Sequence, residues 1–155
     1  MTHVFIFNPI AGKPSRIQQA RKELAEFRAR SSESIQIVET QHKGHATELA
    51  RQAAEQYDPV RIYACGGDGT INEVIQGIVG YPHVEFGCVP IGSGNDFIKN
   101  FNAPDFLDYE KQLTAPSYPV DLILSTGDFG SRYSLNAISL SWDSRVAIEL
   151  ETFKK

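Results

Sequence analysis

The stretch IYACGGDGTINEVIQGI, residues 62–78, decides the fold of this chain. Its apolar beginning, IYAC at 62–65, predicts a buried β-strand. A turn of three glycines around Asp68 follows, and Val74, Ile75 and Ile78 then recur at the spacing of one helical face. A strand, a glycine turn and a helix in this order leave free backbone N–H groups and a positive helix end above the turn. That position suits a phosphate.

Two local explanations of this stretch need no ligand. Glycines supply the dihedral angles of tight turns whether or not anything binds there. Thr70 and Glu73 also have the spacing of a capping box, which needs only a helix that begins nearby. Asp68 favours a functional interpretation, because a carboxylate beside an anion site repels phosphate unless a divalent cation lies between them.

Composition describes an ordinary globular chain. Of its 155 residues, 41% are hydrophobic and 22% are charged, which suits about one domain of common size. The net charge of −4 offers no basic surface for nucleic acid. No apolar run approaches the roughly 20 residues of a membrane helix. Cys65 and Cys88 fall in predicted buried strands and indicate neither a disulfide framework nor a metal cluster. We expect a cytoplasmic protein.

Apolar runs elsewhere predict strands at 4–7, 34–40 and 85–90, and helical spacing predicts helices at about 15–30 and 45–56. Ser15 and Gln18 have the spacing of a capping box for the first helix. Strands that alternate with helices predict an α/β fold with a doubly wound parallel sheet. Ligands of such sheets gather at the carboxyl ends of the strands. Residues 8–12, Thr40, the Asp68 turn and residues 91–97 all fall at that edge.

The pattern changes after about Pro104, so we divide the chain into an α/β domain at 1–104 and a second part at 105–155. A short helix is predicted at 105–113, followed by an antiparallel pair of strands at 120–125 and 131–142 and a helical segment at 144–155. A hairpin and one helix do not make a core of their own. We therefore expect a linker and the beginning of a truncated, mostly β domain. A cut sheet edge and uncovered apolar surface favour self-association into a homo-oligomer.

Two common nucleotide signatures are absent from the sequence. Gly12-Lys13 is followed by Pro14, and Asn72 interrupts the G-x-G-x-x-G pattern, which disfavours a P-loop ATPase and an NAD dehydrogenase. Three other motifs occur in order: NPIAG at 8–12, GGDGTINEV at 66–74 and PIGSGNDF at 90–97. Together they closely resemble the diacylglycerol kinase catalytic domain, a family that includes bacterial lipid kinases and the sphingosine and ceramide kinases. The second motif alone would also fit NAD kinase, whereas the third points to the lipid kinases.

The resemblance implies a kinase that uses ATP and Mg²⁺ to phosphorylate a lipid alcohol such as diacylglycerol at the membrane surface. Mg²⁺ would be bound by Asp68, Asp96 and Asp121. Ser93 stands where the family commonly has Thr and keeps the hydroxyl, whereas Ile98-Lys99 departs from the more usual Ala-Arg. The residues implied for the nucleotide site are Asn8, Pro9, Ile10, Ala11, Gly12, Thr40, Gly66, Gly67, Asp68, Gly69, Thr70, Ile71, Asn72, Glu73, Gly92, Ser93 and Asn95.

No catalytic residue is assigned, because family members place the general base in the later β domain. We therefore expect this piece to bind nucleotide weakly and to phosphorylate no lipid by itself. An NAD kinase-like enzyme and a non-catalytic nucleotide-binding module remain alternatives. Locally, Asn95-Asp96 also fits a helix N-cap, and Asp121 fits an edge-strand acid. His45 heads a predicted helix and is expected to be a surface residue.

Overall fold

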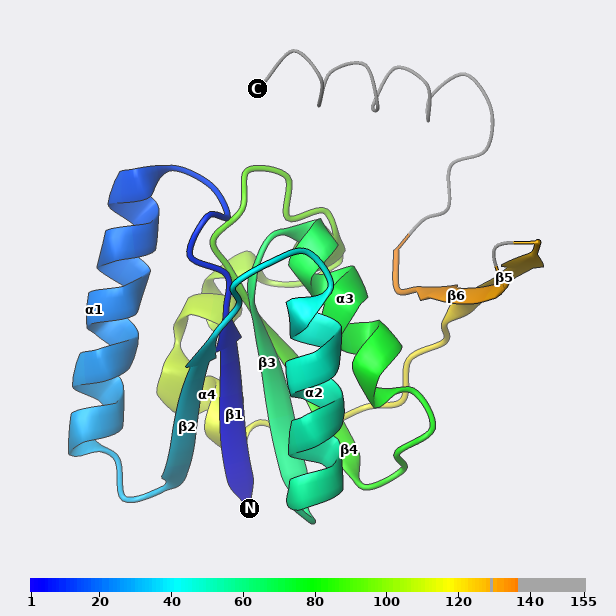
Figure 1. The fold of residues 1–155 in the computed structure, drawn as a ribbon. Helices are drawn as coiled ribbons and strands as arrows, with labels where there is room; N and C mark the ends of the chain where they lie inside the picture. Colours follow the sequence, from blue (N-terminus) through cyan, green and yellow to red (C-terminus); the bar gives the residue numbers. More distant parts are fainter. Residues whose placement is uncertain (129, 137–155) are drawn as a thin grey trace.

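A parallel sheet of four strands forms the centre of the molecule (Figure 1). A computed structural model describes residues 1–128 and 130–136. The strand order is β2-β1-β3-β4, and every neighbouring pair is parallel. The elements in chain order are β1 (Thr2–Phe7), α1 (Pro14–Arg30), β2 (Ser34–Glu39), α2 (His45–Gln56), β3 (Val60–Gly66), α3 (Asp68–Ile78) and β4 (Val84–Pro90). The predicted α/β fold is confirmed.

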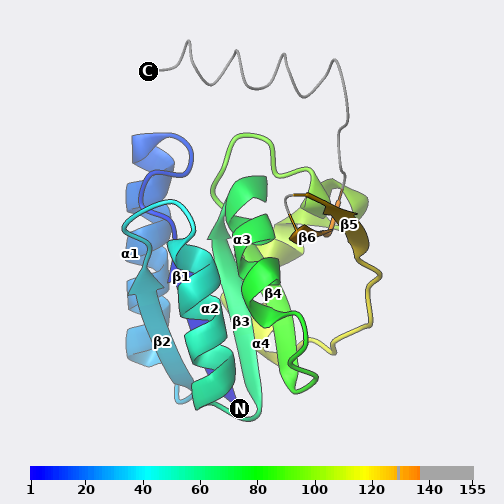
Figure 2. The ribbon, with the colours of Figure 1, turned by 45° about the vertical axis from the view of Figure 1, so that its right-hand side comes forward.

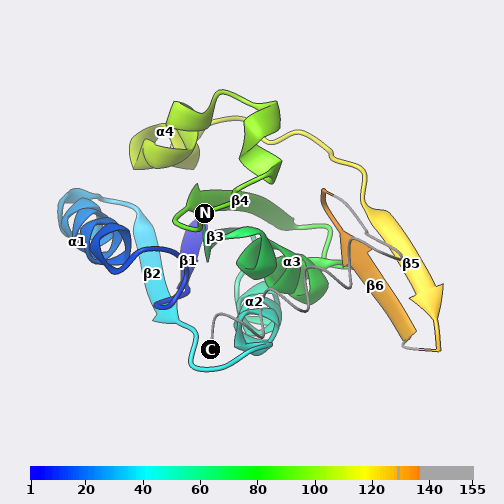
Figure 3. The ribbon, with the colours of Figure 1, turned by 90° about the horizontal axis from the view of Figure 1, so that it is seen from above.

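Helices cover both faces of the sheet (Figure 3). Successive residues of a strand point to opposite faces, so Ile62 packs beneath α2 and α3, whereas Tyr63 belongs to the core of the other face, which also contains residues of α1. The Phe5 and Tyr63 rings stack with their centroids 4.2 Å apart. Because β3 is buried at every position, its near-continuous apolar sequence is typical of a central parallel strand.

The first helix begins differently from the prediction. Pro14 occupies the first turn of α1, and the N-cap residue Lys13 makes no side-chain hydrogen bond. Proline is favoured there because its fixed φ suits a helix and its missing N–H would have no helical partner. The predicted capping box of Ser15 and Gln18 is therefore wrong, since Ser15 already lies inside the helix.

Short elements follow β4. They are the 3-10 helices η1 (Phe97–Asn100) and η2 (Ala103–Leu107) and the helix α4 (Tyr109–Thr114). The helix predicted at 105–113 is thus divided in two. The division falls at Asp108, whose carboxylate accepts a hydrogen bond from the Lys111 N–H at 3.0 Å and caps α4.

An antiparallel hairpin stands beside α3 (Figure 2). It consists of β5 (Ile123–Gly127) and β6 (Gly130–Ser134), so β5 begins three residues later than predicted. Gln76 of α3 anchors the hairpin: its amide donates to the Tyr133 carbonyl at 2.6 Å and accepts from the Tyr133 N–H at 3.1 Å. This small sheet starts the second domain. The remainder of the predicted second strand, at 137–142, and the helical segment at 144–155 lie outside the described residues.

Candidate functional site

The carboxyl ends of the four strands meet along one edge of the sheet, which we call the rim (Figure 1). Backbone bonds continue the sheet just beyond its strands: the Asn8 N–H donates to the Cys65 carbonyl and the Thr40 N–H to the Phe7 carbonyl, both at 2.9 Å. The loops that carry the three sequence motifs therefore begin side by side.

Asn8 joins the loop after β1 to the first turn of α3. Its amide nitrogen donates to the Thr70 hydroxyl at 2.9 Å, and its amide oxygen accepts the Ile10 N–H at 3.1 Å. The Ile10 side chain is 85% exposed above this loop. Thr70 is buried, and its hydroxyl bonds across 62 residues of sequence.

Glu73 joins the connector after β2 to α3. Its carboxylate accepts the Gly44 N–H at 2.9 Å, and its main-chain carbonyl accepts the Thr47 hydroxyl at 2.8 Å. The capping box suggested for Thr70 and Glu73 is wrong, because α3 begins at Asp68 and both side chains bond other segments. The segment that follows Thr40 is instead fastened to α3.

Asp68 fastens the loop after β4. One of its carboxylate oxygens accepts the N–H groups of Asp96 at 2.8 Å and Phe97 at 3.4 Å. The other oxygen faces Gly94, where an added Cβ would lie 2.9 Å from it and 3.9 Å from a carboxylate oxygen of Asp96. Glycine at position 94 thus keeps a small space open between the two carboxylates.

Glycines elsewhere in the rim bring main chain directly against main chain. A Cβ on Gly92 would lie 2.5 Å from the Cα of Gly67. A Cβ on Gly12, whose φ is +93°, would lie 2.2 Å from the Ile91 carbonyl oxygen. The loops after β1, β3 and β4 therefore meet through their backbones, which leaves peptide groups to line the rim.

Asn95 carries a polar atom that fits a ligand. Its φ of 51° lies in the left-handed region, where Asn is tolerated better than most residues. Its amide nitrogen donates to the Gly92 carbonyl at 2.6 Å. Its amide oxygen is buried without a hydrogen-bond partner within the part of the chain that the structure describes. Such an atom costs about 1–3 kcal/mol unless a donor or a cation reaches it.

The carboxylates of Asp68 and Asp96, which face each other across Gly94, offer oxygen ligands of the kind that Mg²⁺ prefers. In the structure, Asp96 instead forms an exposed ion pair with Lys99. The hydrogen bond to Asp96 and its charge raise the pKa of Lys99, and the charge of Asp68 adds to this effect. The ammonium group therefore already balances part of the negative charge of the rim.

Asp121 lies apart from this arrangement in what the structure describes. It is exposed and belongs to the connector before β5, so the edge-strand interpretation is wrong. Among residues 1–128 and 130–136, the carboxylates of Asp68, Asp96 and Asp121 do not form a group whose oxygen atoms all lie within 4.8 Å of one another. Its role as a third metal ligand stays a prediction.

The other predicted site residues differ in what they offer. Ile71 buries its side chain in the core and donates its N–H to the Gly67 carbonyl, which leaves little for a phosphate. Gly69, Asn72 and Ser93 are exposed at the rim, whereas Gly66 is buried and its carbonyl accepts the N–H groups of residues 91 and 92. Pro9 and Ala11 complete the half-exposed loop after β1.

Two neighbouring groups complete the electrostatics. Cys65 and Cys88 are free and buried, as the sequence predicted. Burial raises the pKa of both thiols, that of Cys88 to about 12, with the charge of Asp68 contributing. Both are inert side chains of the core rather than nucleophiles.

The cluster of His42, His45 and Glu48 holds its candidate ligand atoms within 4.8 Å of one another. However, His45 Nδ1 accepts the Gln41 N–H at 3.0 Å, so the ring proton resides on Nε2 and neither nitrogen has a free lone pair. The expectation that His45 is no ligand agrees with this geometry, although the residue is half-buried.

Sequence reasoning did not include Gly94 in the site. The glycine lies in the third motif between Ser93 and Asn95, which was a usable signal. It also did not distinguish the side chains of Asn8 and Asn95. The amide nitrogen and the amide oxygen of Asn8 both form hydrogen bonds within the rim. In the described part of the chain, Asn95 bonds only through its amide nitrogen.

The fold and the rim together indicate a general class of protein. A parallel sheet with glycine-lined main chain and carboxylates at its carboxyl edge is the architecture of α/β proteins that bind phosphate-bearing ligands. The profile of the family described as the diacylglycerol kinase catalytic domain matches residues 2–123. The chain belongs to this family.

Similar proteins agree with that assignment. A protein of Bacillus subtilis (strain 168) that is named as the lipid kinase YtlR is 36% identical over 121 residues. These residues cover 75% of this chain and 39% of YtlR. The diacylglycerol kinase of Staphylococcus carnosus (strain TM300) is 31% identical over 134 residues, which cover 84% of this chain and 42% of that protein. The chain thus spans about two fifths of the length of these relatives.

The fold has a counterpart among solved structures. The crystal structure of a diacylglycerol kinase from Bacillus anthracis str. Sterne superimposes with a TM-score of 0.58 at 23% identity, over 78% of this chain and 44% of that one. At this identity the likeness supports the fold alone. Within the described residues, no helix combines the length and the apolar character needed to cross a bilayer.

Proposed function

We propose that this chain is the nucleotide-binding portion of an ATP-dependent lipid kinase, which acts on a lipid alcohol such as diacylglycerol in phospholipid metabolism. In this reaction the hydroxyl oxygen of the lipid forms a bond to the γ-phosphorus of ATP. The bond from that phosphorus to the β–γ bridging oxygen breaks and ADP leaves. The hydroxyl proton passes to a base that we expect in the later β domain. The protein would work from the cytoplasmic side, peripheral to the membrane.

One observation carries the proposal: Asp68 keeps one carboxylate oxygen bonded to main chain and leaves the other facing Asp96 across Gly94. A carboxylate fixed in this way at the beginning of α3 would hold Mg²⁺ between itself and the phosphates. The ion supplies charge neutralisation when it is bound. Main-chain groups of residues 66–70 would bind the phosphates, and residues 8–12 and Thr40 would line the rest of the nucleotide site.

The test is calorimetric titration of this chain with ATP, with and without Mg²⁺. We expect weak binding that depends on Mg²⁺ and that falls at least about tenfold in Asp68→Asn, since one charged ligand is lost. Asp128→Asn, which changes an exposed carboxylate in the turn between β5 and β6, serves as the matched control. Equal affinity of the Asp68→Asn variant, or binding that is indifferent to Mg²⁺, would overturn the proposal.

The piece by itself is expected to release no phosphorylated lipid. Incubation with radiolabelled ATP and diacylglycerol vesicles checks this, and any labelled lipid would show that the general base lies within these 155 residues. Offering NAD as the acceptor to a longer version of the protein separates the lipid kinase from an NAD kinase-like enzyme.

A further inference from the structure

A side chain of α3 binds the free edge of β6, where the second domain begins (Figure 2). The amide nitrogen of Gln76 donates to the Tyr133 carbonyl at 2.6 Å, and its amide oxygen accepts the Tyr133 N–H at 3.1 Å. These are the two bonds that a neighbouring antiparallel strand forms with one residue. Because β5 pairs with β6 along the other edge, Gln76 takes the place of a strand on this edge.

The position of the hairpin is set at one end of β6. A two-stranded hairpin alone is marginally stable in water, so it needs support from another element. Residues 130–132 of β6 are exposed, whereas Tyr133 is half-buried and Ser134 is buried. The Tyr133 side chain also packs against the core cluster that includes Val74 and Ile78 of α3. In the described residues, the docking of β6 on α3 is therefore concentrated where Gln76 binds.

The same helix carries a carboxylate of the rim. Asp68 is the first residue of α3, and Gln76 lies on the same helix. At about 1.5 Å of rise per residue, the two positions are about 12 Å apart along its axis. Gly69 and Asn72 share the face of Gln76 and are exposed, so this face of α3 is open between the rim and the hairpin. Because a helix is a stiff connection over this length, Gln76 fixes the position of β6 relative to Asp68.

The amide of Gln76 differs from that of an ordinary surface glutamine. A surface glutamine leaves its amide to water, because holding a long side chain in one rotamer costs conformational entropy. Here both polar atoms bond one peptide group that lies 57 residues away in the sequence. The amide nitrogen also donates to the Asn72 carbonyl at 3.3 Å, which keeps the side chain against its own helix. This pairing of one amide with one peptide group indicates a fixed contact between the two domains.

We propose that Gln76 is a positioning residue of the kinase, which fixes the sheet of the second domain on α3 so that the acceptor hydroxyl approaches the phosphates near Asp68 in one orientation. The inference rests on the proposed kinase function and adds which residue relates the two domains. Gln76 acts through β6 and contacts neither substrate in this role. A neutral amide suits the role, because it matches both groups of a peptide and leaves no charge at the contact.

The first experiment measures hydrogen exchange of the Tyr133 amide by NMR in this 155-residue chain. Gln76→Leu keeps a side chain of similar size but removes both hydrogen bonds, so exchange at Tyr133 should become about tenfold faster. The amide of Ile62, in the buried strand β3, should exchange as in wild type, which shows that the α/β domain stays folded. Gln52→Leu is the matched control: Gln52 is exposed on α2, so this variant should change exchange at Tyr133 by less than about twofold.

The second experiment compares kcat with KM in a longer version of the protein that includes the later β domain. Gln76→Leu should lower kcat for lipid phosphorylation about tenfold and leave KM for ATP within about twofold. This division is expected because a misplaced acceptor slows the transfer step while the nucleotide site stays intact. Gln52→Leu should leave both constants unchanged.

The outcomes separate this proposal from the kinase proposal. A Tyr133 amide that is unprotected in wild type, or whose exchange is unchanged in Gln76→Leu, would overturn the contact and leave Mg²⁺-dependent ATP binding untouched. An unchanged kcat in a variant that has lost protection at Tyr133 would overturn the positioning role. Gln76→Leu should keep the Mg²⁺-dependent ATP binding that Asp68→Asn loses. Loss of that binding in both variants would mean that Gln76 supports the nucleotide site itself, and it would refute the role assigned to it.

Discussion

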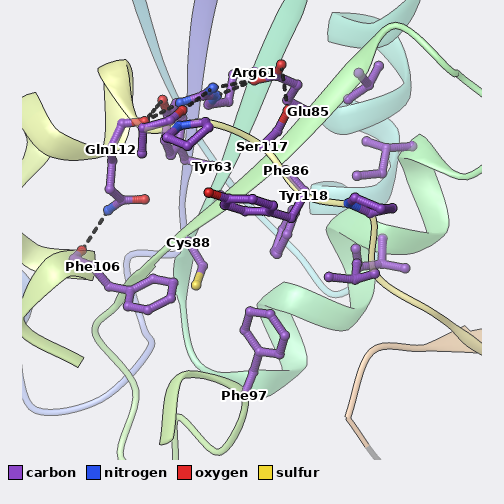
Figure 4. A pocket seen from close by; sticks show the side chains of 18 of the residues that line it. Arg61, Tyr63, Glu85, Phe86, Cys88, Phe97, Phe106, Gln112, Ser117 and Tyr118 are labelled. Carbon is purple, nitrogen blue, oxygen red and sulfur yellow. Dashed lines mark hydrogen bonds and ion pairs between the residues drawn. The ribbon is translucent and has the colours of Figure 1, made fainter. Parts of the chain in front are cut away.

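The rim and a pocket of about 920 Å³ along the free side of β4 meet at Phe97 (Figure 4). The two regions differ in the groups that form their walls. In the rim, glycines bring main chain against main chain, and single carboxylate and amide groups fasten the loops. In the pocket, large side chains supply the wall, and one buried arginine collects the carbonyls at its polar end. The rim should therefore be sensitive to added atoms, whereas the pocket should be sensitive to the loss of a polar partner.

The largest effect is expected where an atom is added to the rim. Gly12→Ala places a Cβ 2.2 Å from the Ile91 carbonyl oxygen and keeps a φ of +93° that alanine adopts poorly. Strain of about 1–2 kcal/mol and overpacking of about 1–3 kcal/mol should together lower the free energy of unfolding by about 2–5 kcal/mol. Urea denaturation followed by circular dichroism measures this.

Gly80→Ala is the matched control for that change. Gly80 has nearly the same φ, +94°, but an added Cβ would meet nothing within 4 Å. It should therefore cost only the strain, about 1–2 kcal/mol. Equal losses in the two variants would mean that close backbone contact does not define the rim.

The next effect concerns the polar end of the pocket. The Arg61 side chain is 10% exposed, so Arg61→Met leaves Glu85 and three carbonyls without their donor. Removing one partner of a buried ion pair typically costs about 3–5 kcal/mol, and partial exposure of Glu85 at 26% places the expected loss at the lower end of this range, about 3 kcal/mol.

Arg21→Met tests the same substitution at the surface. Arg21 and Glu39 form an ion pair whose side chains are 54% and 45% exposed. Water and salt screen such a pair, so its loss should cost at most about 1 kcal/mol in the same denaturation experiment. A loss as large as that of Arg61→Met would indicate that burial does not distinguish the two arginines.

The difference between the two regions also decides what the sequence could predict. The order of strands and helices and the position of Asp68 follow from apolar spacing and from motifs that are contiguous in the chain. The capping box of Thr70 and Glu73 was wrong because that rule assumes partners within one helical turn. Thr70 instead bonds Asn8, 62 residues away, and Glu73 bonds Gly44, 29 residues away.

The pocket could not be predicted, because its wall comes from α3, β4, the 3-10 helices and the segment at 115–122. Phe101 and Val120 carry no local pattern that sets them apart from other surface apolar residues. The unpartnered oxygen of Asn95 is likewise a property of three-dimensional packing. The motif predicted that Asn95 belongs to the site, but only the fold indicates which of its atoms is free.

The smallest expected effect lies in the charge balance of the rim and depends on pH. The pKa of Lys99 is raised above its ordinary 10.5 by its hydrogen bond to Asp96 and by the charge of that carboxylate. A raised pKa means that folding favours the charged ammonium. The stabilisation is therefore complete below pH 10.5 and is lost as pH rises through the higher value of the folded state. The urea midpoints of wild type and Lys99→Met should differ slightly at pH 8. They should converge once the pH exceeds the raised pKa of Lys99 in the folded protein.

Added salt tests whether the difference between wild type and Lys99→Met comes from an exposed ion pair. The Lys99 and Asp96 side chains are 64% and 58% exposed, so 1 M NaCl should remove the difference between wild type and Lys99→Met even at pH 8. The same salt should leave most of the Arg61→Met loss in place, because that pair is shielded from solvent. If salt erases both differences, the pocket is as open to ions as the rim. If it erases neither, the ammonium of Lys99 is held by more than an exposed ion pair.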